Sequence, residues 1–264
     1  MIKKILNSAL VFAIVALLSL GSVNQAQSAD LSPGEGGYVG AFFGFGAGIL
    51  QSKVTSRTNL KGTANSYLHE TDRGGLGLEG IQGGGWLGYG LKTADDIYVG
   101  FDISGMASDE QIKLSTDALK GQSEAEAENN TAITEISAKR KWSAGGAVRV
   151  GYYINPDTLF ALKGGIAVSE IETKIGGVTK DYYAGGPQFG GSIDTRLSKI
   201  DPNLSIRMEA VITDYLTADI LGGGDDGVGR KTGDTGYDAE LTGVDVAARI
   251  GVTYNFDLGL PSLF

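Results

Sequence analysis

The sequence predicts an all-β protein, an eight-stranded antiparallel up-and-down transmembrane β-barrel with short periplasmic turns and long extracellular loops. Three observations support this fold class. Eight stretches alternate apolar residues with small or polar ones, and a period of two indicates β-strands. After an N-terminal leader, no run of about eighteen apolar residues remains, so no transmembrane helix is expected. The connections alternate between short and long, as they do in barrels of outer membranes.

A secretory signal peptide is predicted for residues 1–29. Two lysines near the start precede an apolar run over residues 9–20, and small or polar residues follow it. Cleavage after Ser28 and cleavage after Ala29 both fit this pattern. An uncleaved anchor is the alternative, although the run is shorter than the roughly 20 residues that a membrane span needs. We therefore expect one further domain, the barrel, over residues 30–264.

The composition narrows the possible partners. The chain has 42 Gly, 5 Pro and no Cys, which suits a glycine-lined sheet and makes a disulfide scaffold impossible. Without the leader and its two lysines, 20 basic residues face 31 acidic ones, a net charge of −11. A nucleic-acid partner is not expected, because such partners require a basic surface.

The clearest strand is the last one, over residues 244–256. One of its rows is apolar throughout, and the other is small or polar and includes Asp245 and Arg249. This alternation is longer than a typical globular strand of about five or six residues, but it fits a tilted strand that crosses a bilayer. The apolar row is expected to face lipid, and the polar row is expected to face the barrel interior.

The first half of the chain supplies three strands. Residues 38–51 carry one bulky apolar face and one face that is almost entirely glycine. The polar residues 52–78, which include the sole histidine, His69, are predicted as a long loop. Residues 79–92 and 96–105 are expected to pair as a hairpin.

The second half supplies four strands before the last one. They are predicted at residues 142–154 and 159–170, which form one hairpin, and at residues 183–197 and 204–215, which form another. Pro156 marks the turn of the former hairpin. Polar loops are predicted at residues 107–141, where a short helix is possible, and at 171–181 and 216–242.

The connections predict how the barrel lies in the membrane. Short ones follow the second, fourth and sixth strands, and long polar ones follow the first, third, fifth and seventh, so the turns are assigned to the periplasm. Tyr89, Tyr98, Tyr152 and Tyr254 lie near the turn side, where an aromatic girdle is expected.

In this layout the chain resembles the OmpA-like outer-membrane β-barrel family, which includes small porin-like surface antigens and opacity proteins. The resemblance is carried by residues 36–48, 83–105, 146–169, 204–215 and 248–256. It implies a location in the outer membrane of a Gram-negative cell, reached through the periplasm. It also implies contact with outer-membrane lipids, periplasmic chaperones and the barrel-insertion machinery.

The C-terminus departs from the family pattern, in which the last strand ends the chain on an aromatic insertion signal. Tyr254 and Phe256 fit that signal, but a tail over residues 257–264 follows. Either this tail is tolerated, or Phe264 is the signal. No peptidoglycan-binding domain is expected after the barrel.

Charged residues in the inward rows form the candidate site. They are Asp102, Asp194, Glu209 and Asp245, with Arg149, Lys163, Arg196, Arg207 and Arg249. An eight-stranded barrel is only wide enough inside for side chains, whereas open aqueous pores belong to barrels of about sixteen strands or more. A network that plugs the lumen is therefore favoured over a narrow ion or solute path with the same lining.

Catalytic and metal chemistry have weak support. Hydrolysis would need a nucleophile with a base, but His69 lies in a predicted loop and no Gly-x-Ser-x-Gly is present. A glycine-rich loop contains four aspartates that could bind Ca²⁺, namely Asp225, Asp226, Asp234 and Asp238. Their spacing matches no EF-hand loop, so a solvated loop is favoured. We expect no enzyme, no cofactor and no metal.

The expected function is structural and interactive, with loops that could meet an extracellular partner. A small porin for ions or solutes is the alternative. A third possibility is a soluble lipocalin-like ligand binder, which would place its large apolar rows inward. The sequence leaves the oligomeric state open.

Overall fold

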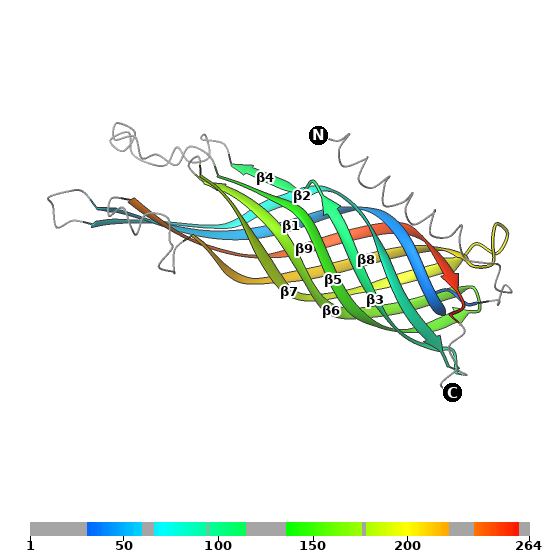
Figure 1. The fold of residues 1–264 in the computed structure, drawn as a ribbon. Coiled ribbons are helices and arrows are strands. Elements are labelled where there is room, and N and C mark those ends of the chain that lie inside the picture. The colour runs from blue at the N-terminus through cyan, green and yellow to red at the C-terminus, as the bar shows by residue number, and fades with distance from the viewer. Residues whose placement is uncertain are drawn as a thin grey trace.

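The computed structural model describes residues 31–59, 66–93, 95–114, 136–175, 178–221 and 235–258. The predicted signal peptide lies outside them. Within the described residues, nine β-strands form one antiparallel sheet that is rolled into an elongated barrel (Figure 1). The strands are β1 (Gly36–Asn59), β2 (Ser66–Lys92), β3 (Ile97–Ser108), β4 (Gln111–Leu114), β5 (Ile136–Asn155), β6 (Thr158–Ile175), β7 (Val178–Arg196), β8 (Leu204–Leu221) and β9 (Thr235–Phe256).

The sheet closes because β1 pairs with both β2 and β9. The short β4 continues the line of β3, since both strands lie between β2 and β5. Because β3 and β4 share one position, the nine segments occupy eight strand positions around the barrel. The predicted closed eight-stranded antiparallel barrel is confirmed. β1 begins and β9 ends at the same end, where Gly37 lies opposite Phe256. We call this the turn end and the opposite one the loop end.

The register fixes the shape of the barrel. The paired residues can be followed from Gly48 through every strand, and the path returns to β1 at Tyr38, ten residues away. Such a stagger requires the strands to tilt, typically by about 35–45°, and eight tilted strands leave an interior that side chains fill.

Side chains alternate between the two faces of the barrel wall. In β3, for example, Val99, Phe101 and Ile103 are exposed, whereas Tyr98 and Asp102 are buried. Large apolar residues are exposed on the outer face of β1 to β3 and of β5 to β9. Most of the charged side chains that are buried point into the barrel. This arrangement is the reverse of a water-soluble domain, whose apolar side chains face inward. No helix among the described residues is long and apolar enough to cross a membrane.

The strands reach further toward the loop end than the apolar alternation predicts. The loop predicted at residues 52–78 is wrong for most of its length, because β1 and β2 stay paired there and His69 lies opposite Ser56. The loop predicted at 171–181 is likewise replaced by paired β6 and β7. Ladder hydrogen bonds join backbone groups and need no apolar side chains, so a polar strand leaves no such signature.

Three further expectations are corrected. The polar stretch at residues 107–141 contains the end of β3, all of β4 and the start of β5, while residues 115–135 lie outside the described chain. Both ends of the loop predicted at 216–242 belong instead to strands, because β8 extends to Leu221 and β9 begins at Thr235. Tyr98 was assigned to an outer aromatic girdle, but it is fully buried inside the barrel because it shares the inward row of Asp102.

The glycine face of β1 makes room for large side chains from neighbouring strands. A side chain at Gly40 would overlap the indole of Trp86. That indole stacks on Phe42 with ring centroids 4.9 Å apart, and its Nε1 donates a hydrogen bond of 2.9 Å to Thr253. The bare wall of β1 is therefore needed to seat the aromatic side chains of the lumen.

Replacing Gly40 by alanine should destabilise the barrel by about 1–3 kcal/mol, because the added methyl group overpacks the interior. Gly105→Ala is the matched control, since a Cβ there meets nothing within 4 Å. Urea titration of the refolded barrels would measure both changes. Equal losses for the two variants would contradict the packing assigned to Gly40.

Candidate functional site: the charged lumen

Seven charged side chains meet inside the barrel nearer its turn end, and we call them the lower ionic layer. They are Asp102, Asp194 and Glu209, with Arg149, Lys163, Arg207 and Arg249, and none is more than 6% exposed. They come from β3, β5, β6, β7, β8 and β9, so the layer spans most of the circumference.

Asp194 receives two arginines. Arg149 Nη2 donates to both of its carboxylate oxygens, at 3.1 and 3.0 Å, and Arg207 Nε donates at 2.9 Å. Arg149 Nη2 also lies 2.6 Å from Ser192 Oγ. Charge-assisted bonds of this kind are roughly twice as strong as neutral ones, so Asp194 fixes the positions of both guanidinium groups.

Lys163 links the other two acids. Its Nζ lies 3.2 Å from Glu209 and 3.5 Å from Asp102. Arg249 Nη1 lies 3.2 Å from the second oxygen of Glu209, and Arg207 Nη1 lies 3.5 Å from Asp102. Every charge in the layer therefore has an opposite charge within 4 Å.

Aromatic faces accompany the arginines. The Arg207 guanidinium lies 4.9 Å from the ring centre of Tyr38 and 4.7 Å from that of Trp86. Arg149 and Arg249 make similar contacts with Tyr98 and Phe42, at 5.3 and 4.9 Å. The layer holds four bases but three acids, and aromatic faces stabilise the excess positive charge through cation–π attraction.

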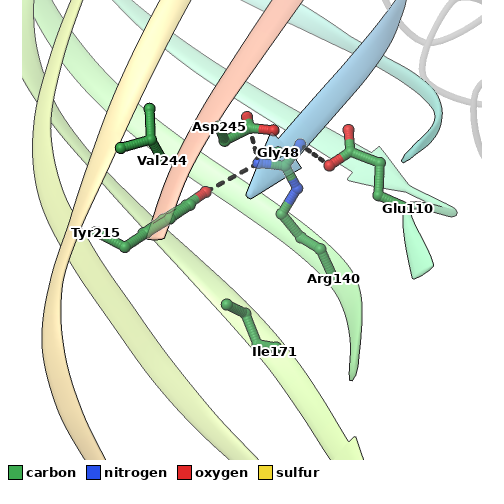
Figure 2. Close-up of a pocket in the computed structure, with 7 residues that line it drawn as sticks. All are labelled: Gly48, Glu110, Arg140, Ile171, Tyr215, Val244 and Asp245. Atoms are coloured by element: carbon green, nitrogen blue, oxygen red, sulfur yellow. Dashed lines mark hydrogen bonds and ion pairs between the residues drawn. The ribbon is translucent and has the colours of Figure 1, made fainter. Parts of the chain in front are cut away.

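A second group of charges, the upper ionic cluster, lies nearer the loop end (Figure 2). Arg140 lies between Glu110 and Asp245 and forms an ion pair with each of them. Its Nη1 donates a hydrogen bond of 2.8 Å to Asp245 and one of 2.9 Å to the hydroxyl of Tyr215. That hydroxyl also lies 2.7 Å from Ser169 Oγ. Glu110, Arg140, Tyr215 and Asp245 line a cavity of about 20 Å³, which is room for about one water molecule.

A β-bulge places Arg140 inside the barrel. Strict alternation from Arg149 through Ser143 would turn Lys141 inward. The ladder between β5 and β6 shifts between Arg140 and Trp142, so an extra residue is accommodated and the faces exchange. Lys141 is instead on the outer surface, with Glu172 and Asp181 at 3.0 and 2.7 Å.

The two groups balance each other in charge. The upper ionic cluster has one base and two acids, which offsets the single excess base of the lower ionic layer. The ten charges together are therefore neutral. A neutral, mutually paired set can be buried at far lower cost than isolated charges.

Of the nine charged residues singled out from the sequence, seven meet in the lower ionic layer and Asp245 lies in the upper ionic cluster. Arg196 lies apart at the turn end, where its Nε is 3.0 Å from Asp157 and Nη2 donates 3.2 Å to Pro156 O. Arg140 and Glu110 were missed, because both fall in the stretch predicted as a loop. The bulge leaves no clear signal in the residue pattern, whereas Glu110 continues the inward period of Asp102.

The remaining predicted positions stand apart from the lumen. Tyr254 and Phe256 are half-buried at the end of β9, where Phe256 lies against Gly37. Phe264, Asp225, Asp226 and Asp234 lie outside the described residues. Asp238 is in β9 opposite Thr55, which corrects its placement in a loop. Within the described ranges, no group of three potential metal ligands comes together.

No protein-family model matches the chain, and a search of curated proteins finds no match. Among solved structures, Neisserial surface protein A has 10% identity and a TM-score of 0.41, covering 84% of this chain and 98% of its own. Outer membrane protein AlkL has 14% identity and a TM-score of 0.36, covering 89% of this chain and 96% of its own. Ail, the attachment invasion locus protein of Yersinia pestis, has 11% identity and a TM-score of 0.33, covering 80% of this chain and 99% of its own. Likenesses at this level leave the function to be argued from the chain's own residues.

Arg140→Ala should destabilise the barrel by about 3–5 kcal/mol, because two buried carboxylates lose their shared partner. Lys141→Ala is the matched control and should cost at most about 1 kcal/mol, as expected for a surface pair. Urea titrations of both variants would test this, and a similar loss for the two would contradict the structural role of Arg140.

Proposed function

We propose that this protein is an integral outer-membrane β-barrel with a structural and surface-interaction role, and that its lumen is closed by paired charges. The observation that carries the proposal is the inverted barrel wall, apolar and exposed outside, charged and mutually paired inside. The protein reaches the outer membrane through the periplasm, after removal of the predicted signal peptide.

The outer surface supports the membrane assignment. Large apolar residues such as Phe45, Leu162 and Ile166 are 51–68% exposed, and similar ones occur on nearly every strand. Exposed apolar area costs about 25 cal/mol per Å² in water, whereas lipid removes that cost. A soluble lipocalin-like binder is not favoured, because its large apolar rows would point inward around a ligand.

The depth of burial supports a closed lumen. Arg149, Asp194 and Arg207 are inaccessible to solvent, and their ion pairs join β5 to β7 and β7 to β8. Opening a path through the lower ionic layer would separate buried opposite charges, at a cost of about 3–5 kcal/mol for each broken pair. We therefore favour a plug over a conducting pore.

A specific observation keeps the small porin as the second candidate. Both carboxylate oxygens of Asp102 and both Nη atoms of Arg207 are buried without a hydrogen-bond partner, although they lie near opposite charges. Such groups are normally satisfied by ordered water. A hydrated lumen could pass small ions, and electrical recording separates the two candidates.

The loop end supports the surface-interaction part of the proposal. The described ladder between β7 and β8 ends at Gln188 and Thr213, next to Pro187, which has no N–H to donate. Both strands continue beyond that point, to Val178 and Leu221, and the sheet spreads apart there (Figure 1). Strand edges of this kind can accept an extended segment of a partner by β-addition.

The proposal includes no enzymatic activity. The sole histidine, His69, lies in β2 near the loop end, and several buried serines, among them Ser169, Ser192 and Ser205, lie on β6, β7 and β8. Its cross-strand neighbour Ser56 lies in no Gly-x-Ser-x-Gly motif. A serine hydrolase needs a base within hydrogen-bond reach of its nucleophile.

The refolded mature protein should insert into a planar bilayer without producing conductance steps, because its lumen is closed. Insertion would be verified separately, from resistance to protease in vesicles and from a gel shift on heating. Discrete and reproducible steps would contradict the plug and favour the porin.

Val252→Arg should cost about 2–4 kcal/mol and reduce insertion, because it places a charge on the outer face of β9. Val252→Leu is the control and should insert normally. The yield of heat-modifiable protein in vesicles measures both, and a normal yield for the arginine variant would contradict the assignment of this face to lipid.

A further inference from the structure

A tight turn at Ser32–Glu35, which we call the N-terminal turn, lies across the turn end of the barrel. The Glu35 amide donates 3.0 Å to Ser32 O, and the Ser32 amide donates 2.9 Å to Glu35 Oε2, so the turn is held from within. Ser32, Pro33 and Gly34 are buried although they precede the first strand. The turn is therefore packed into the barrel mouth.

Hydrogen bonds anchor the N-terminal turn to opposite walls. The Gly34 amide donates 3.1 Å to Asn255 Oδ1 on β9, and the Tyr153 hydroxyl on β5 donates 2.9 Å to Pro33 O. Around the closed barrel of eight strand positions, β9 and β5 are four positions apart and so face each other across the lumen. The turn thus bridges the full width of the mouth.

Apolar side chains form the next level inward. Tyr98, Tyr153, Leu159 and Ala161 make one buried cluster, and the rings of Tyr98 and Tyr153 meet edge to face at 6.2 Å. Gly34 lies directly against this cluster, since a Cβ there would be 3.1 Å from Tyr98 and 3.3 Å from Leu159. Its φ of +80° also favours glycine, so this position is restricted both by conformation and by space.

We propose that the N-terminal turn is a plug of the turn end, separate from the ionic layers and in series with them. The inference deepens the proposed closed barrel and rests on it. Along β6, Ala161 lies between Leu159 under the plug and Lys163 of the lower ionic layer. Along β9, Ala247 lies beyond Arg249, on the loop side of that layer.

The two alanines allow each barrier to be tested by itself. The chain has no cysteine, so Ala161→Cys and Ala247→Cys each introduce a single thiol at a fully buried inward position. Each would be placed in the mature chain and in a chain that begins at Gly36 and so lacks the N-terminal turn. Labelling by a water-soluble maleimide would be timed on refolded, heat-modifiable protein.

Removal of the turn should speed labelling of Cys at position 161 by roughly tenfold or more, because a buried thiol otherwise reacts only through local opening. Labelling at position 247 should be unchanged, since the lower ionic layer still shields it. Unchanged labelling at position 161, or rapid labelling there in the complete chain, would overturn the plug.

The position-247 thiol separates this inference from the proposed function. Faster labelling at both positions would leave the N-terminal turn as a barrier but show that the lower ionic layer is none, so the closed lumen would fail. If the shortened chain does not fold, Gly34→Val in the complete chain unseats the turn through its φ and its clash with Tyr98. The same labelling differences are then expected.

Discussion

The eight-stranded sheet closes on itself with a stagger of ten residues, and the rest of the structure depends on this constraint. It removes every strand edge from the barrel body, and it leaves an interior that side chains must fill. Inward groups then have only one another as partners. Arg140 on β5 reaches Asp245 on β9, and Lys163 on β6 reaches Asp102 on β3. Ion pairs therefore connect strands that share no ladder, and they brace the barrel across its lumen.

The interior is filled unevenly, and this asymmetry gives the charges their environment. Much of the inward face of β1 is glycine, so the indole of Trp86 and the aliphatic part of the Arg249 side chain can lie against bare backbone. Aromatic rings brought in this way cover the arginines. Glycine at these positions is thus part of the charge network, because a larger residue would displace the groups that shield it.

The sequence predicted the closed fold and most inward charges because both follow from alternation with period two. Prediction failed where that period carries no information. Polar strands such as the outer part of β2 look like loops, and a single extra residue at Lys141 exchanges the faces and conceals Arg140. Tyr98 was misplaced because its depth suggested a girdle, although its row pointed inward. The N-terminal turn has no period at all, and its partners Tyr153 and Asn255 are distant in sequence.

The proposed closed lumen rests on barriers in series. If each broken pair costs about 3–5 kcal/mol, an opening that breaks a single pair is populated only about once in 10² to 10⁴ molecules, since 1.4 kcal/mol is a factor of ten. Independent barriers multiply these fractions. The lower ionic layer and the N-terminal turn use different chemistry: paired charges in the layer, and hydrogen bonds between backbone and side chains over an apolar cluster in the turn. A substitution that removes one of the paired charges leaves the hydrogen bonds of the turn in place, so the proposed closed lumen conducts only when both barriers open together.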